Sequence, residues 1–124
     1  MAPATFASIA KIAAVINKLP NSVRLEGHTD ARPIHTSRFR SNWELSVARS
    51  IAMLELLRQR YQFPSEHMSV AGFAENAPAD TNETVEGRAH NRRVDVVVLS
   101  AEAMSGEPPT LKPSPLHVGF EPAA

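Results

Sequence analysis

Two stretches of the chain repeat their apolar residues at helical spacing, and the first lies near the N-terminus. The apolar residues that recur there every three or four positions are Phe6, Ile9, Ala13 and Ile16. In a segment rich in alanine, isoleucine and lysine, this pattern predicts an amphipathic helix from about Thr5 to Leu19. We expect Pro20, followed by Asn21 and Ser22, to end this helix.

A longer helix is predicted in the middle of the chain, after Ser41-Asn42-Trp43-Glu44. This motif has the form of a capping box, in which the serine hydroxyl and the glutamate carboxylate accept hydrogen bonds from backbone N–H groups at a helix start. The helix should end near Gln62, before Pro64. The residues that we expect to form its buried stripe are Val47, Ile51, Leu54, Leu57 and Tyr61.

Three shorter segments have the character of β-strands. Val23 and Leu25 alternate with two charged residues, which is the period of a strand with one buried face, and Gly27 allows a tight exit. Residues 68–73 are expected to form a second short strand. Residues 93–99 are rich in valine, and this β-branched run predicts a third strand in a central position.

The order of these elements indicates the fold class. Two long loops, at residues 28–40 and 74–91, connect them, and the second is predicted to contain one helical turn near 84–91; loops of that length are usually functional. The order helix, strand, helix, strand, loop, strand indicates an α/β sandwich of the α+β type, a small mixed sheet with helices packed on one face. A chain of 124 residues suffices for one domain, which we place at residues 1–100. Residues 101–124 contain five prolines and little periodicity, so we expect a disordered tail.

The charge balance and the hydropathy exclude several classes of partner. Thirteen basic residues match thirteen acidic ones, so no general positive field favours nucleic acids or anionic lipids. No apolar run approaches the roughly 20 residues that a membrane-spanning helix needs. The N-terminus has neither the basic start nor the apolar core of a secretion signal. The absence of cysteine excludes disulfides and thiol catalysis.

A candidate site lies where the first strand leads into the loop before the long helix. Asp30 follows this strand, and Arg49 lies in the first turns of the helix, off the expected apolar stripe. An opposed carboxylate and guanidinium suit a zwitterionic ligand, because Asp30 can accept from an ammonium while Arg49 donates two parallel hydrogen bonds to a carboxylate. A direct ion pair between Asp30 and Arg49 is the commoner arrangement. Spacing alone leaves both interpretations open.

Metal chemistry and hydrolysis find less support in the sequence. The histidines and the acid that could be joined into a metal site form neither helical i,i+4 pairs nor a tight cluster; they are His28, Asp30, His35, His67 and His90. We therefore predict no metal and no cofactor, and we expect His28 to fix its loop by hydrogen bonding. A hydrolase would need a nucleophile such as Thr29, Ser41 or Ser46, but the chain has no nucleophile elbow, and Ser41 already has a capping role.

The basic cluster near the last strand consists of Arg88, Arg92 and Arg93. It could bind phosphate or RNA, but acidic residues surround it and no aromatic residues are interleaved for base stacking. We expect these arginines to form a structural network that ties the long loop to the last strand.

Several motifs, taken together and in order, resemble those of a known family. They are Gly27-His28-Thr29-Asp30 with Pro33-Ile34, Ser41-Asn42-Trp43-Glu44-Leu45-Ser46 with Ala48-Arg49, Gly72-Phe73-Ala74-Glu75 with Pro78, then Asn82, Gly87-Arg88-Ala89 and Asn91-Arg92-Arg93-Val94. They closely resemble the C-terminal domain shared by outer-membrane protein A, the peptidoglycan-associated lipoprotein and the flagellar stator protein MotB. The resemblance covers roughly residues 6–99, and the tryptophan-containing motif together with Pro33-Ile34 looks most like MotB.

This resemblance implies an OmpA-like fold and a non-covalent grip on peptidoglycan through the diaminopimelate of its peptide stem. The diaminopimelate side chain ends in an ammonium and a carboxylate, and by motif Asp30 would take the ammonium and Arg49 the carboxylate. The other implied ligand-binding residues are Asn42, which would support the ligand, Thr29 and Leu45, which would shape the pocket, and Arg93. Arg88 and Asn91 would hold the loop.

The resemblance also implies a setting for the domain. It would not be an enzyme; it would anchor a membrane-attached parent protein or complex to the cell wall in the periplasm, with homodimerisation as an option. Two departures from the family stand out. The strand that precedes the first helix in family members is missing here, so a sheet edge and part of the pocket wall could be missing, and the chain has no membrane helix with the proton-conducting acid of MotB. The alternative is an OmpA-like interaction or dimerisation domain that has lost wall binding.

Overall fold

The computed structural model describes residues 3–100 and 116–119. Its elements, in chain order, are α1 (Pro3–Ile16), β1 (Val23–His28), α2 (Asn42–Arg60), the 3₁₀ turn η1 (Ser65–His67), β2 (Met68–Gly72), α3 (Val85–Asn91), β3 (Arg93–Val98) and β4 (Leu116–Gly119). The helices and strands predicted before residue 100 are all present, and their ends shift by no more than about one helical turn. None of the described helices is long and apolar enough to cross a membrane.

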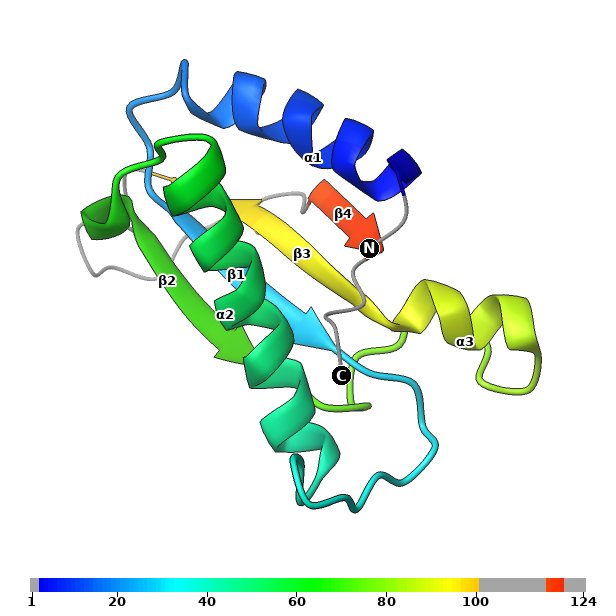
Figure 1. Ribbon diagram of the computed structural model, residues 1–124. Helices are drawn as coiled ribbons and strands as arrows, with labels where there is room; N and C mark the ends of the chain where they lie inside the picture. Colours follow the sequence, from blue (N-terminus) through cyan, green and yellow to red (C-terminus); the bar gives the residue numbers. More distant parts are fainter. Residues whose placement is uncertain (1–2, 101–115, 120–124) are drawn as a thin grey trace.

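The strands form one mixed sheet in the order β2-β1-β3-β4 (Figure 1). β1 and β2 run parallel, so the chain must cross over between them, and α2 is that crossover. β3 pairs antiparallel with β1 on one side and with β4 on the other. The prediction of a small mixed sheet with β3 in a central position is confirmed.

α1 and α2 cover the same face of the sheet, and the hydrophobic core lies between them and the strands (Figure 1). Alternate residues of β1 and β3 face this layer, as the period of a strand requires. The buried core residues are Ile9, Ala13, Ile16, Val23, Leu25, Met53, Leu57, Phe63, Val94 and Val96. The prediction of helices packed on one face is thus confirmed for α1 and α2, whereas α3 lies beyond the end of the sheet where β3 begins. The side chain of Phe6 lies outside the described residues.

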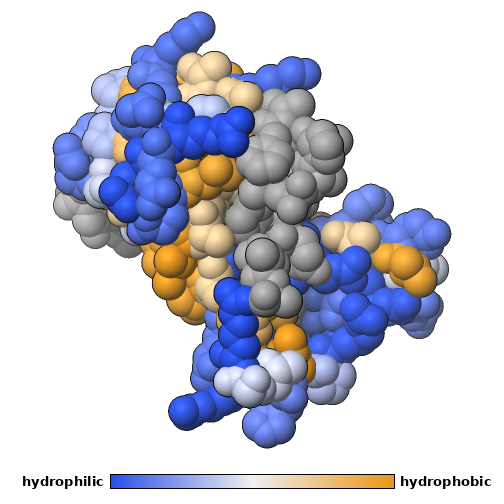
Figure 2. Space-filling view, viewed as in Figure 1, coloured by the Kyte–Doolittle hydropathy of each residue, from blue (hydrophilic) through white to orange (hydrophobic). Residues whose placement is uncertain are grey.

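The stripe predicted to be buried on α2 is partly wrong. Leu57 is buried, and Leu54 and Tyr61 are half-buried against the core, but Val47 and Ile51 are 37% and 46% exposed. Figure 2 shows that hydrophobic surface is exposed along α2. The residues of α2 that are buried instead are Ser46, Arg49, Ser50, Met53 and Leu57.

Two glycines in the sheet explain this rotation of α2. A Cβ atom at Gly27 would overlap the backbone of Ser46 and lie 2.6 Å from the Ser50 Oγ. A Cβ atom at Gly72 would lie 2.6 Å from both the Ser46 Oγ and the Val47 Cγ2. The helix therefore approaches the sheet so closely that only small side chains fit between them. The serines occupy the interface, while Val47, at its border beside Gly72, and Ile51 remain partly exposed.

The free edge of β3 is occupied by a segment from the C-terminal part of the chain. β4 pairs with β3 there, with Val94 opposite Val118 and Asp95 opposite His117. Residues 116–119 of the tail that is expected to be disordered form β4, which corrects that expectation for these four residues. Residues 101–115 and 120–124 of the expected tail lie outside the described residues, and the domain boundary at residue 100 stays a prediction.

Candidate functional site

Three motifs that lie far apart in the sequence meet at one end of the sheet. β1 and β2 are parallel, so both of their C-terminal ends point to this edge, and β3 is antiparallel, so it begins there. The register places Gly27 opposite Gly72 in β2 and opposite Val94 in β3. The loops that follow β1 and β2 and the loop that precedes β3 therefore converge.

Backbone hydrogen bonds join the first two of these loops to each other and to α2. The Thr29 N–H donates to the Ala74 carbonyl oxygen at 2.9 Å, and the Ala74 N–H donates to the Ser46 Oγ at 3.1 Å. Ala74 is fully buried and has a φ of 54°, in the left-handed region that costs energy for residues other than glycine. Its hydrogen bonds on both sides hold it in this conformation.

The serines considered as nucleophiles have structural roles. The Ser41 Oγ accepts from the Glu44 N–H, which confirms the predicted N-cap of α2. The Ser46 Oγ is fully buried, donates to the Trp43 carbonyl oxygen at 2.9 Å and accepts from Ala74. Both hydroxyls are engaged in positioning the backbone around the site.

A pocket of about 280 Å³ opens between the β1 loop, the start of α2 and the end of α3. The residues that line it are Thr29, Asp30, Arg32, Pro33, Ile34, Leu45, Arg49 and Arg92. Four of the six residues expected to bind a ligand are among them: Thr29, Asp30, Leu45 and Arg49. The pocket thus combines an apolar wall with one carboxylate and three guanidinium groups.

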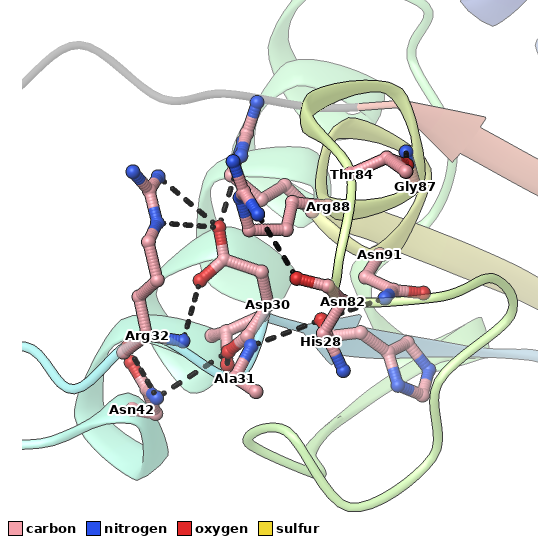
Figure 3. Close-up of polar contacts among 12 residues, drawn as sticks. His28, Asp30, Ala31, Arg32, Asn42, Asn82, Thr84, Gly87, Arg88 and Asn91 are labelled. Carbon is pink, nitrogen blue, oxygen red and sulfur yellow. Dashed lines mark hydrogen bonds and ion pairs between the residues drawn. The ribbon is translucent and has the colours of Figure 1, made fainter.

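Asp30 holds the charged side of this pocket together (Figure 3). Its Oδ1 accepts from the backbone N–H of Arg32 at 3.0 Å. Its Oδ2 accepts from the Arg32 Nε and NH2 groups at 3.3 and 3.2 Å, and from the Arg92 NH1 group at 2.9 Å. Asp30 is only 5% exposed. The acid therefore fixes the turn of its own loop and also ties that loop to the end of α3.

The pKa of Asp30 reflects these contacts. Burial of the carboxyl raises the pKa, but hydrogen bonds from the Arg92 side chain and from the backbone and side chain of Arg32 together outweigh burial. The pKa of Asp30 is consequently lowered from its ordinary value of 3.8. The carboxylate is ionised at any pH above that value and can serve as the acceptor for a cation.

This lowered pKa predicts how stability depends on pH. A carboxyl whose pKa is lower in the folded state contributes stability that is complete above its unfolded-state pKa and is lost as the pH falls through the folded-state pKa. We expect the difference in unfolding free energy between the parent and Asp30→Asn to be the same at about pH 7 and about pH 5, and to shrink only below about pH 4. Urea unfolding of both proteins across this range measures it; a difference that already shrinks near neutral pH would contradict the ionised carboxylate.

Arg49 is buried, contrary to the prediction that it lies off the buried stripe of α2. It is 2% exposed, and its NH1 group donates to the carbonyl oxygen of His28 at 2.8 Å. The close approach of α2 to the sheet places this side chain beneath the end of β1, where the backbone carbonyl orients it. A guanidinium fixed in this way can meet a carboxylate with little further loss of side-chain entropy.

Two residues expected to contact a ligand lie elsewhere. The Asn42 amide donates to the Arg32 carbonyl oxygen at 3.1 Å and to the Glu75 carboxylate at 3.1 Å, so it joins two loops beside the pocket. Arg93 is not among the lining residues of this pocket; its guanidinium donates to Asp95 and to the carbonyl oxygen of Ala77. Its neighbour Arg92, the C-cap of α3, lines the pocket instead.

The alternation of side chains along a strand explains why Arg92 lines the pocket in place of Arg93. Consecutive residues of a strand point to opposite sides, so which of two adjacent arginines faces the pocket depends on where α3 ends and β3 begins. The sequence does not fix that boundary to one residue. The contact between Arg32 and Asp30 could have been predicted from the sequence. An aspartate often accepts a hydrogen bond from the backbone N–H two residues later, in an Asx turn.

The loop between β2 and β3 is held by Asn91 and Arg88, as the family resemblance implies. The Asn91 side chain accepts from the backbone N–H groups of Ala79 and Asp80, at 2.8 and 2.9 Å, and donates to the Asn82 Oδ1. The same Asn82 oxygen accepts from the Ala31 N–H at 3.1 Å, and Arg88 donates to the Asn82 carbonyl oxygen at 3.0 Å (Figure 3). Asn82 thus links the loop before α3 to the loop after β1.

His28 lies on the opposite face of the sheet from α2, in a buried cluster of charged groups. Its ring stacks on Phe73 at 5.2 Å between centroids, and its Nε2 lies 3.2 Å from the Asp95 Oδ2. These contacts differ from the loop-fixing hydrogen bonds expected of its side chain. His28, Glu26 and Asp95 lie close enough to hold a metal ion, but Arg24 already pairs with the Glu26 carboxylate and Arg93 with the Asp95 carboxylate. Guanidinium groups on two of the three ligands disfavour a cation.

Comparison with known sequences relates the chain to one family. A sequence model of the OmpA family matches residues 1–92. Motility protein B of Bacillus subtilis is 42% identical over 85 residues, which cover 68% of this chain and 32% of that protein. The chain spans about a third of the length of the curated relatives it matches.

Solved structures share the fold. The cell wall anchor of the T6SS from Pseudomonas aeruginosa superposes with a TM-score of 0.66 and 34% identity, over 77% of this chain and 66% of that one. The C-terminal domain of Helicobacter pylori MotB superposes with a TM-score of 0.71 and 28% identity, over 86% of this chain and 82% of that one.

Proposed function

This chain belongs to the OmpA family, and we propose that it is a cell-wall anchor that binds peptidoglycan without chemistry. The observation that carries this proposal is that Asp30 and Arg49 line one pocket, with an apolar wall beside them. A carboxylate and a guanidinium that line the same small pocket suit a ligand group that carries both a positive and a negative charge. The serines near the site are engaged in capping and loop contacts, so binding is the function that this geometry supports best.

The ligand that we propose is the diaminopimelate of the peptide stem. Its side chain ends in an ammonium and a carboxylate on one carbon atom. Asp30 accepts from the ammonium, and Arg49 donates to the carboxylate. Thr29 and Leu45 shape the wall, and Asn42 supports the pocket through the loops it joins. Arg92, rather than Arg93, is the arginine of the last motif that we place beside the ligand.

The similar proteins support the setting of this proposal. One is described as a cell wall anchor and another as a motility protein. We propose that this domain works in the periplasm and anchors a membrane-attached parent protein or complex. Pairing of two copies, or tethering to a membrane, would raise the effective strength of binding through local concentration.

Selectivity between wall types tests the role of Arg49. A stem with lysine in place of diaminopimelate keeps the ammonium and lacks the side-chain carboxylate, so Arg49 would lose its partner on the ligand. An unsatisfied buried donor costs about 1–3 kcal/mol, so we expect roughly ten- to a hundredfold weaker binding to lysine-type peptidoglycan. Co-sedimentation of the purified chain with the two insoluble wall types measures the ratio.

Two results would contradict the proposal in different ways. Equal sedimentation with both wall types would remove the role given to Arg49. If the folded chain sediments with neither, the anchor proposal fails, and an OmpA-like interaction domain that has lost wall binding takes its place. Circular dichroism establishes in either case that the chain is folded.

A further inference from the structure

The carboxylate that is proposed to receive the ligand's ammonium already has partners. A carboxylate offers about four lone-pair sites in all. The Oδ2 of Asp30 accepts from two nitrogens of the Arg32 side chain and from Arg92. The Oδ1 accepts from the backbone N–H of Arg32. A ligand ammonium therefore reaches full contact with Asp30 only if one guanidinium gives up its place.

Exposure and distance indicate that Arg32 is the group that leaves. Its side chain is 66% exposed, and its two contacts with the Asp30 Oδ2 measure 3.3 and 3.2 Å. The Arg92 side chain is 25% exposed, and its contact measures 2.9 Å. Although Asp30 is buried, the Arg32 guanidinium is exposed and its contacts are long, so water can replace it at small cost in free energy. The Arg32 side chain can therefore turn away at low cost while its backbone N–H keeps Asp30 in position (Figure 3).

After this movement, the Arg32 guanidinium remains at the pocket rim without the acid it contacted. Arg32 lines the same pocket as Asp30 and Arg49. A guanidinium is always charged and matches a carboxylate through two parallel hydrogen bonds. A second carboxylate on the ligand, next to the zwitterionic group, would supply the partner that Arg32 gives up.

We propose that Arg32 is a specificity-determining residue. Its guanidinium leaves Asp30 when the ligand's ammonium binds there, and it then binds a second free carboxylate of the peptide stem. The preferred ligand then carries one ammonium and at least two carboxylates that are not amidated. This inference rests on the proposed function and deepens it, because it names the chemical form of the stem that the pocket selects.

Isothermal titration with two synthetic peptides tests the inference. The first is N-acetyl-L-alanyl-γ-D-glutamyl-meso-diaminopimelate with all its carboxylates free, so that the diaminopimelate side chain carries its one ammonium group. The second is the same peptide with the D-glutamyl α-carboxylate and the carboxylate at the L-centre of diaminopimelate converted to amides, which leaves the side-chain ammonium and carboxylate intact. We expect the parent chain to bind the first roughly tenfold more tightly than the second, the usual scale of one charge-assisted contact.

The variant Arg32→Gln removes the guanidinium and keeps the backbone N–H that holds Asp30. We expect it to bind the two peptides with equal affinity, and to bind the amidated peptide at least as tightly as the parent does, since no arginine competes for Asp30. Arg38→Gln is the matched control: it makes the same charge change in the same exposed loop, outside the residues that line the pocket. It should keep the tenfold preference.

The possible failures can be told apart. If the parent binds both peptides equally, or if Arg32→Gln keeps the full preference, Arg32 does not read a second carboxylate and the inference is overturned while the anchor proposal stands. If the folded parent binds neither peptide and does not sediment with the wall, the proposed function fails and the inference fails with it. If Arg32→Gln lowers the affinity for both peptides by the same factor, the inference is also overturned, because Arg32 would then have a general role in the pocket.

Discussion

Replacing Asp30 by Asn should lower the affinity for diaminopimelate-type peptidoglycan by roughly a hundredfold or more, because removal of one partner of a buried charge pair typically costs 2–5 kcal/mol. The amide has almost the same shape as the carboxylate but lacks its charge. It also presents an N–H₂ group to Arg92 and Arg32, which are donors as well. The variant therefore loses the acceptor for the ammonium and loosens the β1 loop. Co-sedimentation with the wall measures the affinity.

A matched control separates the role of this acid from a general loss of negative charge. Asp80 is 42% exposed at its side chain, pairs with His90 and is not among the residues that line the pocket. Asp80→Asn should sediment like the parent. Circular dichroism on both variants checks that they are folded. A folded Asp30→Asn chain that sediments like the parent would remove Asp30 from the binding site and leave its part in the loop as its only function.

Replacing Gly27 by Ala should destabilise the domain by about 3 kcal/mol, the upper part of the usual range for overpacking a core. The added Cβ atom would overlap the backbone of Ser46 and approach the Ser50 Oγ to 2.6 Å. Backbone in the middle of a helix cannot move aside by itself, so α2 as a whole must lift from the sheet. Because α2 carries Arg49 into the pocket, binding should weaken together with stability.

Gly72→Ala provides a graded comparison for this prediction. Its nearest neighbours would be the ends of two side chains, the Ser46 Oγ and the Val47 Cγ2, both at 2.6 Å. Val47 is 37% exposed and can turn outward, so the loss of stability should be clearly smaller than for Gly27→Ala. Urea unfolding of both variants measures the difference. Equal stability of Gly27→Ala and the parent would contradict the close contact between α2 and β1.

The helix start and the loop contacts were predictable because they depend on neighbours in the sequence. At the start of α2 the Ser41 hydroxyl accepts from the Glu44 N–H three residues later, as a capping box predicts, whereas the Glu44 carboxylate accepts from the Arg40 N–H and not from that of Ser41. The cluster around Asn91 and Arg88 likewise closes on a loop that lies within 6 to 12 residues upstream. The alternation of Val23 and Leu25 with charged residues predicts a half-buried strand for the same local reason.

The orientation of α2 was not predictable from its own residues. Its apolar pattern favours a stripe through Val47 and Ile51, and an amphipathic helix that packs by this pattern alone would turn that stripe toward the core. In the fold, two glycines from different strands lie under the helix and admit Ser46 and Ser50. Close packing of the backbones then decides which face is buried, and Arg49 becomes a buried side chain as a consequence.

Local patterns in the sequence were enough to predict the helices and strands before residue 100 and the fold class, and the motifs were enough to predict the likeness to peptidoglycan-binding domains. The tertiary structure alone decided that β4 joins the edge of β3, that Arg92 rather than Arg93 lines the pocket, and that Arg32 covers Asp30. The physical reason is the range of the interactions. Periodicity and capping act within a few residues of the chain, whereas the depth of a helix on a sheet and the side on which a strand presents each residue depend on partners that are distant in sequence.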